Sequence, residues 1–417
     1  MKMIIKNISE LIQTEEKSRK WVSGKNMAKL NTIKDAFIEI DNGKISSFGC
    51  MDNWKGIEDW NSTEVIDAEG GVVFPSYCDS HTHLVFAESR EQEFVDRING
   101  LTYQEISKKG GGILNSAKKM QKISEEELIR ISLSKLQKVI ETGTGAIEIK
   151  SGYGLNLKSE IKILKVIKKL KEISPLTIKS TFLGAHAVPE EYSKERYLEL
   201  IIKEMLPQIQ EENLADYVDV FCEKGYFNIE DTIKILEESN KLGIKGKVHV
   251  NQFNAFGGVE ASVKAGVISV DHLEEMREQD FTALIGANCM PTLLPSCSFI
   301  LGIPYAPARE MIKRNLPIAL ATDYNPGSAP NSNMNFVSSL GCIKMKMTPN
   351  EVINSTTINS AYAMGIEKEV GSICIGKTAN LFITKEIPSY SYLHYSYGEN
   401  LINKVILNGK IINKKTD

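Results

Sequence analysis

Short apolar segments recur through the middle of the chain. Eight of them are rich in β-forming residues, and they lie at 71–75, 146–150, 178–183, 217–222, 247–250, 267–272, 287–293 and 317–323. Short strands that are apolar throughout are typical of a parallel sheet that is buried on both faces. The pattern therefore predicts eight parallel strands.

The segments between these strands have the periodicity of amphipathic helices. Residues 124–143 begin at Ser124, which predicts an N-cap, and Glu127 three residues later completes a capping box. Residues 157–172 and 228–243 show a similar pattern. The middle of the chain is therefore predicted to alternate strands with helices.

Eight strand–helix units predict an α/β architecture, a (β/α)8 TIM-like barrel, over residues 71–365. The competing architecture is an open doubly wound sheet, which needs a glycine-rich turn after its first strand. Here the first predicted strand runs into PSYCDSHTHL instead. We therefore favour the barrel.

The two ends of the chain have a different pattern, with short stretches of alternating apolar and polar residues. These stretches lie within residues 1–70 and within residues 366–417. Asp-Asn-Gly at 41–43 and Asn-Gly at 408–409 are typical hairpin turns. We expect one small β-sandwich domain that is built from both termini.

The composition is that of a globular protein. The 417 residues are 42% hydrophobic and 25% charged, and the net charge of −3 indicates no surface for a nucleic acid or a membrane. No apolar stretch approaches the roughly 18 residues of a membrane-spanning helix. The N-terminus lacks the apolar core of a signal peptide, and the seven scattered cysteines form no CxxC pair. We expect a cytoplasmic protein with neither nucleic acid nor membrane as partner.

Five of the six histidines fall at or just after the carboxyl ends of predicted strands. They are His81, His83, His186, His249 and His272. In a (β/α)8 barrel these strand ends form the one face on which active sites are built. Residues i and i+2 of a strand point to the same side, so His81 and His83 can both turn inward. The pattern predicts that the imidazoles converge.

A metal site would explain this convergence. His81, His83 and His249 offer three nitrogens, and Asp323 at the end of the last predicted strand offers a carboxylate oxygen. That donor set suits zinc or ferrous iron, with one coordination position left open for water. Each residue alone also fits a core histidine or a turn residue, but their joint placement favours the metal site. The sixth histidine, His394, lies in the terminal β region and is expected at the surface.

The order of these residues resembles the amidohydrolase superfamily, in which HxH is followed by His, His and Asp at strand ends. Over residues 79–328 the chain is also similar to the branch of that superfamily that opens the ring of 4-imidazolone-5-propanoate. This narrower resemblance rests on DSHTHLVFAESREQEF, GGGIL, EIKSGYGL, TFLGAHAVP, DVFCEKGYF, KVHVNQF, VDHLE and ATDYNPGS, in the family's order. HxH alone supports only the superfamily, whereas Arg90 with the KSGYG, GAHAVP and NPGS segments is more specific.

The resemblance implies metal-dependent hydrolysis of the cyclic amide C–N bond of 4-imidazolone-5-propanoate to N-formimino-L-glutamate, a step of histidine degradation. It also implies a small-molecule substrate, one metal ion per chain (Zn2+ or Fe2+/Fe3+) and a homodimer. The implied metal ligands are His81, His83, His249 and Asp323. The implied substrate-binding residues are Arg90, Tyr153, His186, Gln252, Asn325, Gly327 and Ser328.

The chemistry of the residues agrees with this reaction. A bound zinc or iron ion lowers the pKa of water towards roughly 7 and polarises a carbonyl. The hydroxide so formed attacks the ring carbonyl, and we expect His272 and Asp323 to be the catalytic proton shuttle to the leaving nitrogen. Arg90 can bind the propionate carboxylate with its forked guanidinium. The alternative for Arg90 is a surface salt bridge with Glu88, Glu91 or Glu93.

Two other functions stay open from the sequence. A purine or pyrimidine deaminase of the same superfamily typically has a glutamate three residues after the third histidine, but that position is Gln252, whose amide cannot exchange a proton at neutral pH. A non-catalytic scaffold with this barrel usually lacks several ligands, whereas all four are present. Lys150 at a strand end makes a second metal conceivable, although the resemblance indicates one. The glycine-rich segment 110–113 is a candidate lid or an ordinary connector.

Overall fold

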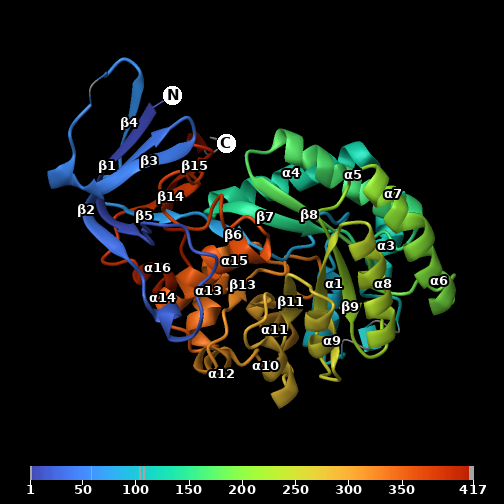
Figure 1. Cartoon of the computed structure of the whole chain (residues 1–417). Helices are drawn as coiled ribbons and strands as arrows, with labels where there is room; N and C mark the ends of the chain where they lie inside the picture. Colours follow the sequence, from blue (N-terminus) through green and yellow to red (C-terminus); the bar gives the residue numbers. More distant parts are fainter. Residues whose placement is uncertain (1, 58, 103–104, 107–108, 413–417) are drawn as a thin grey trace.

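Two sheets organise the chain, one in a barrel and one in a smaller domain beside it (Figure 1). The computed structural model describes residues 2–57, 59–102, 105–106 and 109–412. The barrel strands are β6 (Tyr77–Asp79), β7 (Thr144–Lys150), β8 (Thr177–Ala185), β9 (Tyr217–Cys222), β10 (Lys245–Val250), β11 (Ser269–His272), β12 (Met290–Leu293) and β13 (Ala319–Leu320). They pair in chain order, and every pair is parallel.

The first and last barrel strands meet through the residues that follow them. Thr82 and Tyr324 form a parallel bridge, and the backbone N–H of Asp323 donates to the carbonyl of His81 at 3.0 Å. Thr322 adds two hydrogen bonds to the carboxylate of Asp79, from its N–H at 3.0 Å and from its hydroxyl at 2.6 Å. The sheet therefore closes on itself, and the predicted (β/α)8 barrel is confirmed.

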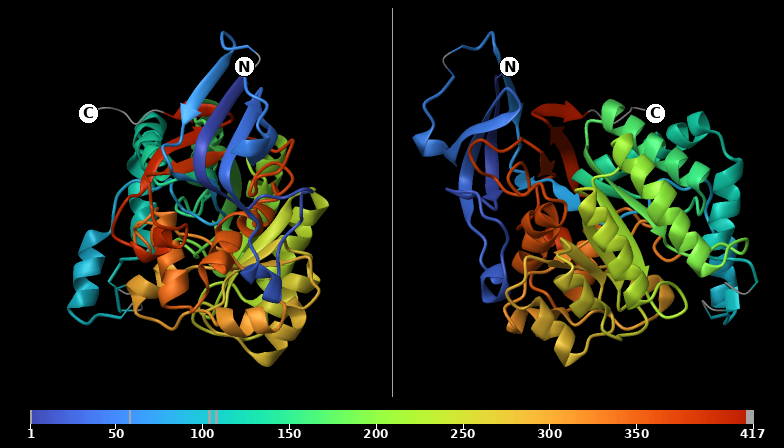
Figure 2. Two further views of the ribbon diagram at one scale, coloured as in Figure 1. Left: turned by 90° about the vertical axis from the view of Figure 1, so that its left-hand side faces the viewer. Right: turned by 45° about the vertical axis from the view of Figure 1, so that its right-hand side comes forward.

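The helices surround the barrel, and in Figure 2 they form its outer wall. Their bounds are α1 (Glu91–Ile98), α3 (Ile113–Lys122), α4 (Glu125–Glu141), α5 (Leu157–Ile173), α6 (Lys194–Leu200), α7 (Leu206–Glu211), α8 (Ile229–Lys241), α9 (Gly258–Lys264), α10 (Glu278–Leu284), α11 (Pro295–Leu301), α12 (Ala308–Lys313), α13 (Met334–Ile343), α14 (Pro349–Thr356), α15 (Ile358–Ala363) and α16 (Tyr392–Tyr395). Ser124 caps α4 as predicted, accepting from the N–H of Glu127. Only half of the predicted capping box forms, because the carboxylate of Glu127 binds Arg130 instead.

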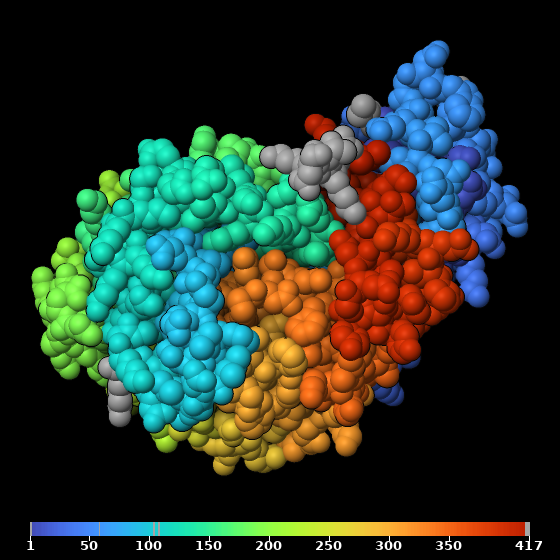
Figure 3. All heavy atoms as spheres, turned by 180° about the vertical axis from the view of Figure 1, so that it is seen from behind, coloured from blue at the N-terminus to red at the C-terminus, as the bar shows by residue number. Residues whose placement is uncertain are grey.

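The small domain is a mixed sheet of segments from both ends of the chain. Its strands are β1 (Lys2–Ile12), β2 (Thr32–Asp41), β3 (Lys44–Cys50), β4 (Thr63–Asp67), β5 (Val72–Pro75), β14 (Leu381–Thr384), β15 (Ile402–Leu407) and β16 (Lys410–Ile412). Asn42 and Gly43 turn the chain from β2 to β3 with φ of 48° and 78°, and Asn408 and Gly409 do the same between β15 and β16. Figure 3 shows the N-terminal and C-terminal segments in contact at one end of the molecule. The expected β domain from both termini and its two hairpins are therefore present.

One strand assignment was wrong. The segment 71–75, predicted as the first barrel strand, is β5 of the small domain, where it pairs with β1 and β14. Its residues are apolar throughout because Val73 packs in the small-domain core whereas Val72 and Phe74 pack in the barrel core. The true first barrel strand, β6, begins only two residues after β5 ends. The division into domains at residues 70 and 366 stays a prediction.

His394 is also not at the surface, as the sequence had suggested. It lies in α16, which packs against α13, and only 3% of the residue is exposed. Neither ring nitrogen has a hydrogen-bond partner, and burial lowers the pKa of its imidazole to about 4. This histidine is therefore a neutral core residue remote from the other five.

The helices of the described residues include none that is both long enough and apolar enough to cross a membrane.

Candidate active site

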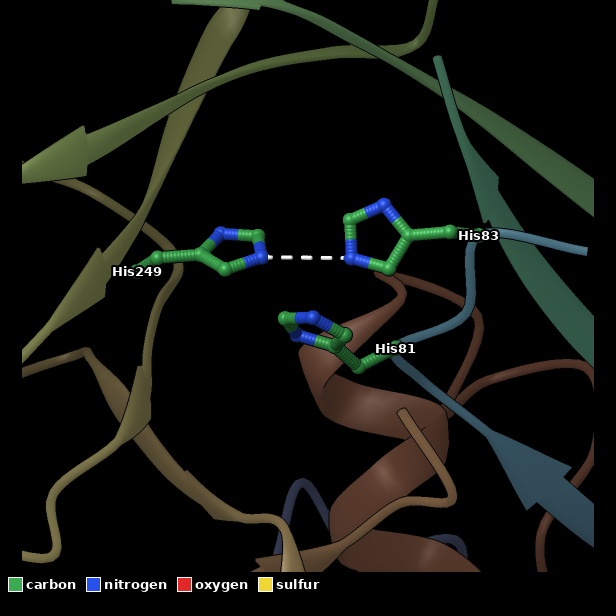
Figure 4. Close-up of side chains that lie close together, drawn as sticks. All are labelled: His81, His83 and His249. Carbon is green, nitrogen blue, oxygen red and sulfur yellow. Dashed lines mark hydrogen bonds between the residues drawn. The ribbon is translucent and has the colours of Figure 1, made fainter. Parts of the chain in front are cut away.

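Three imidazoles meet at the carboxyl ends of the barrel strands. His81 and His83 follow β6, His249 lies in β10, and Figure 4 shows their rings around a common space. Nε2 of His249 lies 3.4 Å from Nε2 of His83. Oδ1 of Asp323 lies 3.5 Å from Nε2 of both His81 and His83. The structure thus brings together all four residues that the sequence singled out as ligands.

The spacing of these donors fits one metal ion. Donors about 2.1 Å from a tetrahedral ion are about 3.4 Å from one another, close to the separations found here. Nε2 of His81 is buried and has no hydrogen-bond partner, as expected of an atom that binds a cation. Burial is the largest of the effects that hold the pKa of His81 and of His83 well below the ordinary value. The rings are therefore neutral, which is the form that binds metals.

Two carboxylates behind the rings fix which nitrogen faces the common space. Nδ1 of His81 lies 2.6 Å from Oδ2 of Asp271, and Nδ1 of His249 lies 3.0 Å from Oδ2 of Asp219. A ring held in this way through Nδ1 presents Nε2 to the common space. Such partners hold a ligand in place and make it a stronger base.

These carboxylates belong to a charged cluster inside the barrel. The ammonium of Lys150 lies 2.6 Å from Glu148, 2.8 Å from Asp219 and 3.6 Å from Asp271. Lys247 forms a second ion pair with Glu148. Burial opposes the charge of Lys150, but the three carboxylates outweigh it and hold its pKa above the ordinary value. Three carboxylates thus contact two ammonium groups behind the imidazoles, and burial is the main effect that raises the pKa of Asp271 above its ordinary value.

A pocket opens beside these histidines. It is lined by His83, Arg90, Ile113, Tyr153, His186, Phe221, His249, Gln252, His272, Asp323, Asn325 and Ser328. Six of the seven predicted substrate-binding residues are in this set, and the seventh, Gly327, lies against the guanidinium of Arg90. Residues more than 200 positions apart in the chain therefore share one pocket.

Arg90 is buried in the pocket wall, with 6% of the residue exposed. Its Nε and Nη1 have no hydrogen-bond partner, and its nearest ion-pair partner is Glu93, 3.6 Å from Nε. A Cβ on Gly327 would lie 1.5 Å from Nη2, so only glycine leaves room for this guanidinium. The alternative of a surface salt bridge holds only in part, because the ion pair with Glu93 forms but Arg90 is buried and not at the surface. The pocket instead holds a buried cation that has no strong anionic partner.

The turn after the last strand is held by its own asparagine. Oδ1 of Asn325 accepts from the N–H groups of Gly327 and Ser328, both at 2.8 Å. Its Nδ2 donates to the carbonyl of Asp323 at 2.6 Å and to the hydroxyl of Ser328 at 2.9 Å. Asn325 therefore shapes the turn that carries Asp323 and makes room for Arg90.

His186 and Tyr153 face His83 from the next strands. The ring of His186 stacks on that of His83, with centroids 5.2 Å apart and planes 15° apart. Nδ1 of His186 lies 3.0 Å from the carbonyl of Gly152, and burial is the main cause that lowers the pKa of its imidazole to about 3. The ring of Tyr153 lies 5.5 Å from that of His186. His186 is thus neutral, donates from Nδ1 and offers Nε2 as an acceptor.

His272 faces the site although the preceding residue, Asp271, does so too. Successive residues of a regular strand point to opposite sides. The backbone leaves the strand conformation at His272 and Leu273, where φ is 89° and 67°, so both side chains can face the site. Nδ1 of His272 lies 3.4 Å from Oε2 of Glu274. Burial opposes a charge on His272, but Glu274 and further carboxylates raise its pKa above the ordinary value. The other ring nitrogen is left for the pocket.

The side-chain amide of Gln252 is anchored from behind. Its Nε2 donates to the sulfur of Cys297 at 3.3 Å. Its Oε1 is then free to accept a hydrogen bond in the pocket.

The sequence reasoning did not assign roles to Asp219, Asp271 and Glu274. Asp219 and Asp271 are charged residues inside apolar strands, YVDVFC and VISVDH. A charged side chain is almost never fully buried unless it is paired. The position of these two aspartates in buried strands was therefore the signal that could have identified them. Glu274 follows its strand with no such signal, because charged residues are common after strands.

Comparison with known proteins shows to which protein family the chain belongs. The Amidohydrolase family model matches residues 72–412, so the chain belongs to the amidohydrolase family. Family membership and the buried histidine cluster together support a metal cofactor.

Two relatives give a narrower assignment. An imidazolonepropionase of Flavobacterium johnsoniae is 56% identical over 98% of this chain and 99% of its own length. An imidazolonepropionase of Christiangramia forsetii is 54% identical over 99% of this chain and 100% of its own. The chain therefore belongs among the imidazolonepropionases of that family.

The fold itself is shared more widely. A guanine deaminase of E. coli superimposes with a TM-score of 0.76, covers 100% of both chains and is 13% identical. At that identity the likeness shows the fold alone.

Proposed function

We propose that this chain hydrolyses the ring C–N bond of 4-imidazolone-5-propanoate to give N-formimino-L-glutamate, a step of histidine degradation. The observation that carries the proposal is the buried guanidinium of Arg90, without a hydrogen-bond partner at Nε and Nη1, in the same pocket as His83, His249 and Asp323. A substrate with a carboxylate tail and a cyclic amide matches both features. The full-length identity to imidazolonepropionases supports the same reaction.

His81, His83, His249 and Asp323 would hold the metal, with three nitrogens and one oxygen. When bound there, a zinc or iron ion activates water and polarises the ring carbonyl. Imidazole and carboxylate suit both metals, so the donor set leaves the choice between Zn2+ and iron open. We propose one ion per chain, because the ammonium of Lys150 is engaged by three carboxylates and is not free to carry a second.

The other pocket residues bind and orient the substrate. Arg90 binds the propionate carboxylate with the forked geometry that guanidinium and carboxylate share. Oε1 of Gln252 and Nε2 of His186 accept hydrogen bonds from ring N–H groups. The 325–328 turn and Tyr153 close the remaining sides of the pocket. The reacting carbonyl is thereby kept beside Asp323 and His272.

His272 and Asp323 share the proton transfer. A carboxylate oxygen of Asp323 would accept the proton that the attacking water releases, and that proton would pass by way of His272 to the leaving ring nitrogen. His272 is held through Nδ1 by Glu274, so its other nitrogen faces the pocket and serves the leaving ring nitrogen and the oxyanion. The ring C–N bond breaks as that nitrogen gains the proton.

A deaminase of the same superfamily is a weaker candidate. Gln252 occupies the position where such enzymes typically have a glutamate, and its amide cannot shuttle a proton. The likeness to guanine deaminase concerns the fold alone, and the scaffold alternative does not account for four converging ligands.

We also propose a homodimer in the cytoplasm, acting on a small molecule with neither nucleic acid nor membrane as partner. All seven cysteines are free, which suits a reducing compartment. The candidate lid at 110–113 stays a proposal; Ile113 lines the pocket at its end.

The test is a spectrophotometric assay with freshly generated imidazolone propionate, combined with detection of formiminoglutamate. We expect the ring chromophore to disappear, the activity to vanish after chelation, and Zn2+ or Fe2+ to restore it. Asp323→Asn protein purified in the same way controls for host enzyme. Ammonia release from a nucleobase without ring opening would instead support the deaminase.

A further inference from the structure

A buried glutamate outside the pocket holds the loop that follows β7. Glu160 lies in the first turns of α5 and is 0% exposed. Its Oε1 accepts from the N–H groups of Gly154 at 2.7 Å and Leu155 at 2.9 Å. Its Oε2 accepts from the N–H of Gly152 at 3.0 Å. One carboxylate therefore binds three of the four amides from Gly152 to Leu155.

The loop takes a conformation that needs such a partner. Gly152 and Leu155 have φ of 103° and 52°, in the left-handed region. Backbone N–H groups that converge in this way form a concave site for an anion. A Cβ on Gly154 would lie 2.4 Å from the backbone nitrogen of Glu160, so loop and helix are in close contact. Without the carboxylate, three buried donors would have no partner.

The same loop determines where two pocket side chains lie. Tyr153 sits between the amides that Glu160 binds, and its ring lines the pocket. The carbonyl of Gly152 accepts from Nδ1 of His186, which fixes the ring that stacks on His83. A shift of Gly152 therefore moves both Tyr153 and His186 relative to the substrate.

We propose that Glu160 is a positioning residue that sets substrate affinity by holding the loop 151–155. It touches neither substrate nor metal and acts through Gly152, Tyr153 and His186. The kinetic part of this inference rests on the proposed function, whereas the loop-holding part does not.

Glu160→Gln is the sharpest variant. The glutamine oxygen can still accept from Gly154 and Leu155, but its NH2 would face the N–H of Gly152, donor against donor. The unpaired buried donor disfavours the loop conformation that the pocket needs, so KM should rise about 10-fold, equivalent to about 1.4 kcal/mol. We expect kcat to change less than about threefold, because the metal ligands, His272 and Asp323 are untouched.

Glu351→Gln is the matched control. Glu351 is another buried carboxylate, which accepts from the N–H of Thr348 at 2.7 Å and binds Arg309, and it does not line the pocket. Its loss should lower the melting temperature and leave KM unchanged. A merely structural role for Glu160 would give the same result, so unchanged KM in folded, metal-loaded Glu160→Gln overturns the proposal.

Hydrogen–deuterium exchange tests the loop without any substrate. In the wild-type protein, peptides covering 151–155 should exchange slowly, and in Glu160→Gln they should exchange at least about 10-fold faster. Fast exchange in the wild type overturns the proposal even if the variant does not fold. If the wild type protects these amides but opens no imidazolone ring, the proposed function fails and the loop-holding role stands.

Discussion

Asp271 offers a sharp test of how the barrel prepares the metal site. Its carboxylate lies 2.6 Å from Nδ1 of His81 and 3.6 Å from the ammonium of Lys150. Asp271→Asn keeps the size of the side chain and an oxygen that can still accept from His81. The change therefore removes mainly the negative charge behind the ligand.

The size of the effect follows from the charges around the imidazoles. In Asp271→Asn, Glu148 and Asp219 remain as the carboxylates that pair with Lys150 and Lys247, so the cluster has one carboxylate fewer behind the imidazoles. Loss of a carboxylate behind a ligating histidine typically weakens metal binding 10–100-fold, or about 1.4–2.7 kcal/mol. We expect the dissociation constant for Zn2+ to rise by that factor.

Competition with a chromogenic chelator gives the dissociation constant directly, and circular dichroism confirms that the variant is folded. Glu351→Gln serves again as a buried carboxylate remote from the pocket, and its zinc affinity should match the wild type. The reasoning is refuted if folded Asp271→Asn binds Zn2+ within about twofold of the wild type, because the charge beneath His81 would then be irrelevant to the ion.

Three further outcomes follow from the structure. His272→Ala should retain its metal and lower kcat by about 10²–10⁴-fold, and steady-state kinetics with metal analysis would contradict the proton-transfer role if turnover stayed near normal. Arg90→Lys should raise KM sharply with little change in kcat, and Gly327→Ala should do likewise by displacing the guanidinium; unchanged KM in both would mean that the carboxylate binds elsewhere. Burial lowers the pKa of His394 to about 4, so its contribution to stability is present above the ordinary value near 6.5 and is lost as the pH falls through 4. Denaturant titrations at pH 7 and pH 4 measure the fall in the free energy of unfolding. That fall should be larger by about 3 kcal/mol in the wild type than in His394→Phe, and equal falls would mean that His394 does not cause it.

The convergence of the candidate ligands could be predicted from the sequence because its signal is local. A histidine or aspartate just after a short apolar strand is visible in the sequence, and closure of the barrel then brings such residues together. This holds for His81, His249 and Asp323, whose side chains lie at one end of one sheet.

The sequence could not show to which domain a strand belongs when two neighbouring strands have the same apolar composition. The segment 71–75 and β6 are both buried and apolar, and only long-range pairing with β1 and β14 assigns 71–75 to the small domain. His394 has ordinary polar neighbours in the sequence, but α16 is covered by α13. The role of Glu160 is equally hidden, because its partners are backbone amides and not side chains that a motif could show.

The shared sheet of the small domain has a consequence for the order in which the protein can be completed on the ribosome. Strand β5 is synthesised early, but its pairing partner β14 (Leu381–Thr384) is synthesised some three hundred residues later. Until then the nascent chain exposes an apolar strand edge, the kind of surface that recruits chaperones or joins other chains.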